Sequence, residues 1–277
     1  MIDAAAGLLR CPHCLDPLLR HEGSVRCDRG HSFDIARQGY VNLLRGDEHL
    51  GTADTTAMVD ARQRFLAAGH FRPITDALVA RTADVESPGG VIDIGAGTGH
   101  HLAGVLDGAP HRIGLALDIS TAALRRAARS HPRLTAIGCD VWGPLPIRSD
   151  VAAVVLDVFS PRNPPELLRI THRDGILCVV TPSNRHLHEL VDALGMVTVD
   201  PDKERRLDES LGGHFVQIDR TDLEWDMNLD RVDTEAAVTM GPSARHLDST
   251  ATAMRLDALG SPASVTASVT LTTWRRR

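Results

Sequence analysis

The stretch VIDIGAGTGHH, residues 91–101, decides how the centre of the chain folds. It begins as a short buried strand and continues into a loop with glycine at every second position: Gly95, Gly97 and Gly99. A strand that passes through a glycine loop into a helix is typical of a doubly wound α/β sheet. A dinucleotide-binding loop reads GxGxxG, whereas this loop reads GxGxG and has the acid Asp93 within its strand.

Strand-like and helix-like segments alternate after this loop, as in a parallel sheet with crossover helices. The expected strands are RIGLALDIS, LTAIGCD, VAAVVLDVF and GILCVVTPS, the last followed by a helix over about 184–194. Two segments with alternating polarity, HFVQIDRTDLEWDMNL and SVTASVTLTTW, flank a helical segment over about 233–260. We expect these two segments to form an antiparallel pair that closes the sheet.

The GxGxG loop resembles motif I of the Rossmann-like S-adenosylmethionine (SAM) methyltransferases. SAM has no pyrophosphate, and glycines without a Cβ atom would let its methionyl group and ribose lie close to the backbone. Asp118 ends the second strand and suits bonds to two ribose hydroxyls, although that alone does not exclude NAD. The resemblance assigns the adenine amino group to Asp140. A plain strand–helix turn remains the alternative for the glycines, and a helix cap for Asp118.

A second motif lies near the N-terminus, in CPHCLDPLLRHEGSVRCDRGH, residues 11–31. Its CxxC…CxxxH spacing matches a closed tetrahedral zinc site with these ligands: Cys11, Cys14, Cys27 and His31. We prefer His31 to His13 and His21 because its position mirrors the first pair. The module is too small to fold on its own core, so metal binding would supply folding free energy. A redox pair is disfavoured because no βαβ unit precedes it.

Composition limits the class of protein. The 277 residues carry a net charge of −6 and five cysteines, with no apolar run long enough for a membrane span and no signal-like N-terminus. These features predict a cytoplasmic protein without a disulfide framework. We expect three parts: a zinc module over 1–45, a helical region over 46–90 with two helices broken near 69–73, and a methyltransferase domain over 91–277. Cys139 and Cys178 are expected as buried small hydrophobic residues.

Taken together, the segments CPHC…CDRGH, FDIARQGYVNLL, MVDARQRFLAAGHFRPI, VIDIGAGTGHH, FSPRNPPE, TPSNRHLHEL and TMGPS resemble one family. This is the RlmA-like family of bacterial 23S rRNA (guanine-N1)-methyltransferases, and NPPE and TMGPS resemble its Gram-positive, tylosin-resistance branch. The resemblance implies a homodimer whose zinc modules help to hold a large-subunit rRNA hairpin, with macrolide resistance as a possible consequence. It also implies that the SAM pocket draws on these residues: Phe71, Gly97, Thr98, His100 and His186.

Methylation of guanine N1 requires an acceptor for the proton that this nitrogen carries at neutral pH. Asp157, at the end of the fourth strand, is our candidate, with Asp54 and Glu166 as further candidates. The target base would have to leave its stack, and three aromatic side chains are candidates to stack on it: Phe159, Phe71 and Tyr40. For His100 and His101, surface or helix-capping roles compete with cofactor contact.

Two other functions remain open. The negative net charge leaves open a small-molecule SAM methyltransferase of antibiotic biosynthesis on the same scaffold, and the second alternative is an RNA-binding protein without catalysis. An RNA enzyme should lose substrate affinity steeply as salt rises, whereas a small-molecule enzyme should not. The intact glycine loop with Asp118 and Asp140 argues against a non-catalytic protein.

Overall fold

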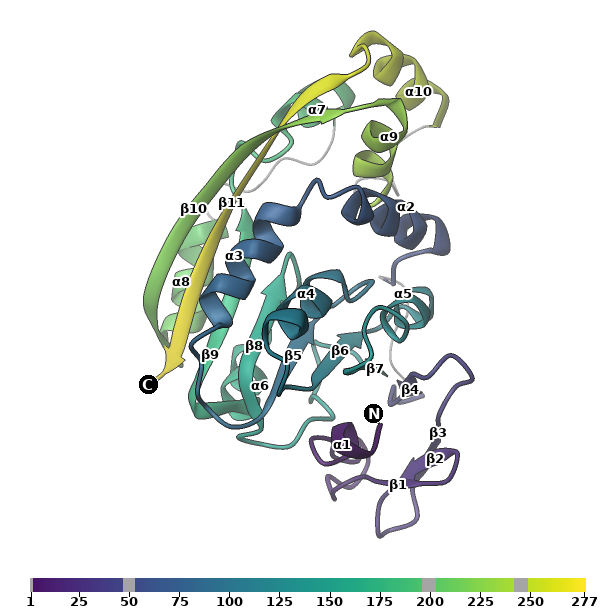
Figure 1. Cartoon of the computed structure of the whole chain (residues 1–277), viewed down its shortest axis with the longest axis vertical. Coiled ribbons are helices and arrows are strands. Elements are labelled where there is room, and N and C mark those ends of the chain that lie inside the picture. Colours follow the sequence, from purple (N-terminus) through teal and green to yellow (C-terminus); the bar gives the residue numbers. More distant parts are fainter. Residues whose placement is uncertain (1, 47–52, 196–202, 242–248) are drawn as a thin grey trace.

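The computed structural model describes residues 2–46, 53–195, 203–241 and 249–277. Its centre is a sheet with the strand order β10-β11-β9-β8-β5-β6-β7-β4 (Figure 1). The strands are β4 (Val41–Asn42), β5 (Gly90–Ile94), β6 (Gly114–Asp118), β7 (Leu134–Gly138), β8 (Ala152–Val158), β9 (Thr171–Pro182), β10 (Phe215–Leu229) and β11 (Ala263–Arg276). Strands β4 to β9 in this sheet are parallel, and β11 is antiparallel to both β9 and β10. The predicted α/β sheet, closed by an antiparallel pair, is confirmed.

The central strands are buried on both faces, which explains their nearly continuous apolar sequences. Successive side chains point to opposite faces, so Val91 joins the core on one side of the sheet and Ile92 the core on the other. The two helices before the glycine loop and several of the helices that connect the strands contribute side chains to the first core. The second core includes residues of the N-terminal module.

Two helices precede the glycine loop, α2 (Thr56–Ala67) and α3 (Arg72–Thr82). Thr55 caps α2 by accepting a hydrogen bond from the Met58 backbone N–H at 3.3 Å. The predicted break between the two helices is present, and Gly69 has a left-handed φ of 86° there. Figure 1 shows α3 alongside α4, and α2 between α5 and α9.

The remaining helices connect the strands and cover both faces of the sheet. They are α4 (His100–Gly108), α5 (Thr121–Ala127), α6 (Pro164–Ile170), α7 (His188–Leu194), α8 (Lys203–Gly212), α9 (Arg231–Thr239) and α10 (Ser249–Ala258). The helix expected over 184–194 begins only at His188, after Leu187 with a φ of 56°. The segment expected over 233–260 contains two helices, and residues 242–248, which include part of TMGPS, lie outside the described residues. Across the described ranges, no helix has the length and apolar character needed to cross a membrane.

The N-terminal module consists of α1 (Ile2–Ala6) and a three-stranded antiparallel sheet of β1 (Leu19–His21), β2 (Ser24–Arg26) and β3 (Ser32–Asp34). Its residues Leu9 and Leu18 are fully buried in the second core. The short strand β4 follows the module and pairs with β7, so the module continues directly into the main sheet. The division at 45/46 and 90/91 into separate units remains a prediction.

Candidate functional site

Three thiols and one imidazole meet in the N-terminal module. The ligand atoms of Cys11, Cys14, Cys27 and His31 all lie within 4.8 Å of one another. His31 Nδ1 is 3.5 Å from Cys11 Sγ and 3.3 Å from Cys27 Sγ, and the sulfurs of Cys14 and Cys27 are 3.5 Å apart. Zinc with bonds of about 2.0–2.3 Å requires tetrahedral ligand separations of about 3.5–3.8 Å. The donor set and its spacing therefore fit a structural Zn²⁺ ion.

Two tight turns place these ligands. Leu15 N–H donates to Cys11 O at 2.9 Å, and Gly30 N–H donates to Cys27 O at 3.0 Å. The other two histidines near the module have different surroundings: His13 stacks on Phe33 with ring centroids 5.8 Å apart, and His21 is exposed on β1. The geometry therefore selects His31 as the fourth ligand, as the sequence predicts.

The glycine loop joins β5 to α4 at the carboxyl end of the sheet. Its glycines Gly95, Gly97 and Gly99 have φ angles of 64°, 55° and 75°, which L side chains rarely adopt. A Cβ atom on Gly99 would lie 2.8 Å from Ser130 Oγ, and one on Gly95 would overlap Ser160 Oγ. The loop is therefore packed closely against the protein at these two positions.

A Cβ atom on Gly97 would instead approach the side chain of Arg62 at ordinary contact distances of 3.4–3.5 Å. Asp118, at the end of β6, fixes the loop by accepting a bond from Gly97 N–H at 2.8 Å and another from Ser120 N–H at 2.8 Å. Asp118 is thus both a loop anchor and the predicted ribose ligand. The capping side chain of α5 is Ser120, not Asp118.

Three carboxyl groups converge where β5, β6 and β8 end. Asp93 is 3% exposed and Asp157 is fully buried. Burial, followed by the neighbouring Asp157 and Asp118, raises the pKa of Asp93 well above its usual value. Burial also raises the pKa of Asp118, although the two backbone N–H groups oppose this shift. In a doubly wound sheet, ligands bind in the crevice outside these strand ends, and a positively charged ligand there would relieve the repulsion among the three acids.

Aromatic rings from distant parts of the chain gather beside this crevice. Phe71 precedes α3, and its ring centroid lies 5.6 Å from that of His186 and 6.0 Å from that of Phe159. The Phe159 and His186 rings are 5.5 Å apart, and Trp225 meets Phe71 edge-on at 6.2 Å. Phe71 is buried, whereas Phe159 is 39% exposed and has a left-handed φ of 56°. The structure thus brings the predicted donor-pocket residues Phe71 and His186 together with Phe159, a predicted stacking residue.

The three predicted proton acceptors have different surroundings. Asp157 lies at the end of β8, and its Oδ1 is 3.3 Å from Arg162 Nε. Glu166 accepts bonds from Arg10 at 3.3 Å, Arg169 at 2.7 Å and the Leu145 backbone N–H at 2.7 Å. These donors lower the pKa of Glu166 against the opposing effect of burial. Glu166 therefore links the N-terminal module to α6 rather than facing the crevice.

The third candidate, Asp54, lies before α2 and forms an ion pair with Arg62. Its backbone carbonyl accepts a bond from Ser120 Oγ at 2.8 Å, which joins it to the end of β6. Asp140 follows β7 and accepts a bond from the Trp142 N–H at 3.0 Å. Arg62, Ser160, Arg162 and Trp225 were not predicted as site residues, because only the tertiary fold brings them to the loop, to Asp157 or to Phe71.

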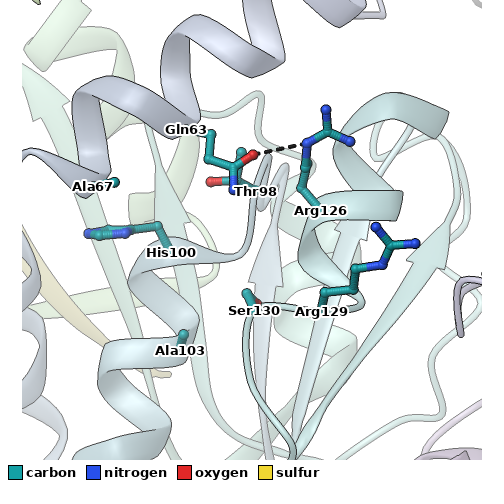
Figure 2. A pocket seen from close by; sticks show the side chains of 8 residues that line it. All are labelled: Gln63, Ala67, Thr98, His100, Ala103, Arg126, Arg129 and Ser130. Carbon is teal, nitrogen blue, oxygen red and sulfur yellow. Dashed lines mark hydrogen bonds between the residues drawn. The ribbon is translucent and has the colours of Figure 1, made fainter.

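A cavity of about 410 Å³ opens on the outer side of the glycine loop, between α2, α4 and α5 (Figure 2). It is lined by Gln63, Ala67, Thr98, His100, Ala103, Arg126, Arg129 and Ser130. Arg126 donates to Gln63 Oε1 at 2.9 Å and pairs with Asp60 at 2.5 Å. Burial lowers the pKa of His100, so its ring is neutral near pH 7. The cavity therefore presents two guanidinium groups together with neutral polar side chains.

His101 has a different, structural position. Its ring packs between α4 and α3, where Nδ1 lies 2.8 Å from Thr75 Oγ1, and burial lowers its pKa to about 3. Cys139 and Cys178 are buried, as expected. Tyr40 is half-buried and packs against the first core.

Comparison with known proteins identifies close relatives. A family model described as the RlmA N-terminal zinc ribbon matches residues 9–46, which contain the whole Cys₃His cluster. A 23S rRNA (guanine(748)-N(1))-methyltransferase of Streptomyces fradiae is 49% identical over 270 residues, covering 96% of both chains. A putative 23S rRNA (guanine-N(1)-)-methyltransferase of Micromonospora griseorubida is 47% identical, covering 96% of this chain and 97% of the relative. The predicted family and its zinc-ribbon module are thereby confirmed.

Solved structures show the same fold at low sequence identity. A putative methyltransferase from Bacillus halodurans aligns with a TM-score of 0.50 and 15% identity, covering 72% of this chain and 97% of the other. The YcgJ protein from Bacillus subtilis aligns with a TM-score of 0.50 and 15% identity, covering 73% and 98%. The fold is that of the class I SAM-dependent methyltransferases, as the glycine loop and strand order indicate.

Proposed function

Because the chain belongs to the family of 23S rRNA (guanine-N1)-methyltransferases, we propose that it methylates N1 of a guanine in a hairpin of large-subunit rRNA, with SAM as donor. The observation that carries this proposal is the 49% identity to the Streptomyces fradiae enzyme over 96% of both chains. The match therefore extends over nearly the whole length of both chains, not over one domain alone. If the chain were a small-molecule methyltransferase, we would not expect it to match an rRNA methyltransferase along its whole length.

We place the donor outside the carboxyl ends of β5, β6 and β7, where ligands bind in sheets of this type. Asp118 and Asp140 would hold the ribose and the adenine, beside a loop made of Gly95, Gly97 and Gly99. Thr98 and His100, which follow Gly97, and the rings of Phe71 and His186 complete the proposed donor site. SAM supplies an electrophilic methyl group on a positively charged sulfonium, and this charge would favour the ionised form of the carboxyl groups at the strand ends.

Positioning accounts for most of the catalysis in this proposal, since methyl transfer is an in-line displacement. Phe159 is the exposed ring of the aromatic cluster, so it is the best placed to stack on a guanine taken out of the RNA. Asp157 ends the same strand two residues earlier and is the proposed acceptor of the N1 proton. Arg162 holds Asp157 at 3.3 Å in the structure, so the carboxylate would have to exchange this partner when the substrate binds.

The RNA would be held by the zinc module and by basic side chains near the crevice. The cavity with Arg126 and Arg129 is a place where a backbone phosphate could bind, because guanidinium groups match phosphate geometry. A homodimer would bring two zinc modules to one RNA, as the family resemblance implies. We also propose a cytoplasmic location, where ribosomal RNA is available, and resistance to macrolides such as tylosin as the consequence of methylation.

Mass mapping of large-subunit rRNA from cells with and without the protein tests the proposal. The expected result is a single guanine that gains the mass of one methyl group, and that lacks it when Asp118 is replaced by alanine. Binding of the purified hairpin should weaken steeply with salt. Unchanged guanine masses, together with salt-independent binding of a small-molecule acceptor, would favour the biosynthetic alternative. Sedimentation of the purified protein tests the dimer separately.

A further inference from the structure

Arg62 is the cation that lies on the glycine loop. It comes from α2, more than thirty residues before the loop, and its Nη1 is 3.4 Å from the position that a Cβ atom on Gly97 would occupy. Its side chain is 27% exposed. Arg62 Nη2 donates to Met240 O at 2.8 Å, and Nη1 pairs with the carboxylate of Asp54. The guanidinium is thus held in one place from two sides.

The proposed donor carries an anionic group that a cation at this loop would bind. The methionyl end of SAM has a carboxylate, which pairs well with a guanidinium, and Asp118 accepts a bond from Gly97 N–H at 2.8 Å, so a second carboxylate at the loop would need a cation beside it. Arg162, another arginine near the strand ends, lies beside the fully buried Asp157. Arg62 instead packs against the buried Gly97 and fills the side of the loop from which a Cβ atom is missing.

Resting on the proposed function, we propose that Arg62 binds the methionyl carboxylate of the methyl donor and thereby orients its sulfonium toward the acceptor site. A guanidinium has five N–H donors, and two of its nitrogens take part in the bonds to Asp54 and Met240. The remaining N–H groups can bind a carboxylate at the part of the side chain that is exposed. In this proposal Arg62 contacts the methyl donor itself. It does more than link α2 to the end of α9.

The test compares two ligands on two variants by isothermal titration calorimetry. SAM and decarboxylated SAM share the adenosine, sulfonium and amino groups and differ only in the carboxylate. In the Arg62→Met variant we expect SAM affinity to fall by about 10–100-fold, the usual range for truncating one partner of a charged hydrogen bond. The affinity for decarboxylated SAM should change by less than about threefold, because that ligand has nothing for Arg62 to bind.

Arg64→Met is the matched control, since Arg64 is an exposed arginine on the same helix. It should leave both affinities unchanged. Equal losses of affinity for SAM and for decarboxylated SAM in Arg62→Met would show that Arg62 only supports the loop, and would overturn the inference. Unchanged SAM affinity in this variant would also overturn it. If Arg62→Met unfolds, Arg62→Lys provides the same comparison, with a smaller loss confined to SAM.

The experiment separates this inference from the function on which it rests. If the wild-type protein binds SAM and methylates rRNA but prefers SAM no more than its decarboxylated form, only the role of Arg62 fails. If the wild-type protein binds neither ligand, the proposed function fails as well. A wild-type preference for SAM that Arg62→Met abolishes supports both.

Discussion

Alanine substitutions at two nearby glycines should rank in opposite order for stability and for SAM affinity. Gly95→Ala should lose more stability, and Gly97→Ala should lose more SAM affinity. Gly95 and Gly97 have similar positive φ angles, 64° and 55°. Each Gly→Ala change therefore places a Cβ atom in a left-handed backbone conformation, which costs about 1–3 kcal/mol. Reduced freedom of the unfolded chain returns about 0.4–1 kcal/mol of that cost. Backbone strain alone would therefore lower the stability of the two variants by nearly the same amount.

Packing separates them. The Cβ atom of Ala at position 95 would overlap Ser160 Oγ and lie 3.0 Å from Ser160 Cβ, in a place where Ser160 is buried. Overpacking of this kind adds about 1–3 kcal/mol. The Cβ atom at position 97 meets only the flexible end of Arg62 at 3.4 Å. Gly95→Ala should therefore be less stable than Gly97→Ala by about 1–3 kcal/mol.

Donor affinity should show the reverse order. The Cβ atom at position 97 points to the side of the loop where we place the donor, whereas the one at position 95 points into the protein. We expect Gly97→Ala to lose about tenfold or more in SAM affinity, equivalent to about 1.4 kcal/mol. Urea unfolding of the zinc-loaded protein measures the first difference and calorimetry the second. Ser160→Gly should restore part of the stability of Gly95→Ala.

Two results would refute this reasoning. Equal stability losses in the two variants would mean that the loop relaxes away from Ser160 at no cost. Wild-type SAM affinity in Gly97→Ala would mean that the donor does not lie on the Arg62 side of the loop, and that the glycines serve a plain strand–helix turn.

Three further predictions concern the metal, the RNA and pH. Cys27→Ser should leave the purified protein without its zinc by atomic absorption and should lower the unfolding temperature, because ligand loss removes metal-derived folding free energy. Arg129→Gln should weaken hairpin binding and reduce the slope of log affinity against log salt by about 1, with SAM affinity unchanged. The control is Arg173→Gln, because Arg173 is exposed on β9 and remote from the cavity. An unaltered slope in Arg129→Gln would exclude a phosphate at the cavity. The raised pKa of Asp93 means that the folded protein holds a proton that the unfolded chain releases. The contribution of Asp93 to the free energy of unfolding is therefore complete below the unfolded-chain pKa of 3.8 and declines as pH rises through the raised pKa of the folded protein. Asp93→Asn should flatten this decline in urea titrations at successive pH values, and parallel curves for variant and wild type would contradict the assignment.

The amino-acid sequence was sufficient to predict features that depend on local pattern. Buried strands reveal themselves as short apolar runs, which is why β5, β6 and β8 were predicted close to their observed bounds. The CxxC…CxxxH spacing identified four ligands because each pair lies in one tight turn. The helix break before Pro73 was also local, since Gly69 and Pro73 are both adapted to the ends of helices.

Features that depend on tertiary contacts could not be predicted in the same way. Strand β4 has only two residues and no recognisable period, and it becomes a strand because β7 is beside it. Glu166 was considered as a proton acceptor because its charge is visible in the sequence, but its bonds to Arg10 and Arg169 are visible only in the fold. Arg62 was one of several basic residues on a predicted helix, and nothing in its neighbourhood indicated that Gly97 would lie against it.

The contacts of the zinc module explain why a metal site can matter to a reaction that it does not touch. Asn42 of β4 pairs with Gly138 at the end of β7, and Leu43 N–H donates to Gly138 O at 2.8 Å. Gly138 has no room for a side chain there, because a Cβ atom would lie 2.6 Å from Asn42 Oδ1. The proposed adenine ligand Asp140 follows two residues later. We therefore expect a metal that orders the module to order β4 and, through it, the end of β7, so that the proposed RNA-holding module and the proposed adenine ligand lie along one edge of the sheet.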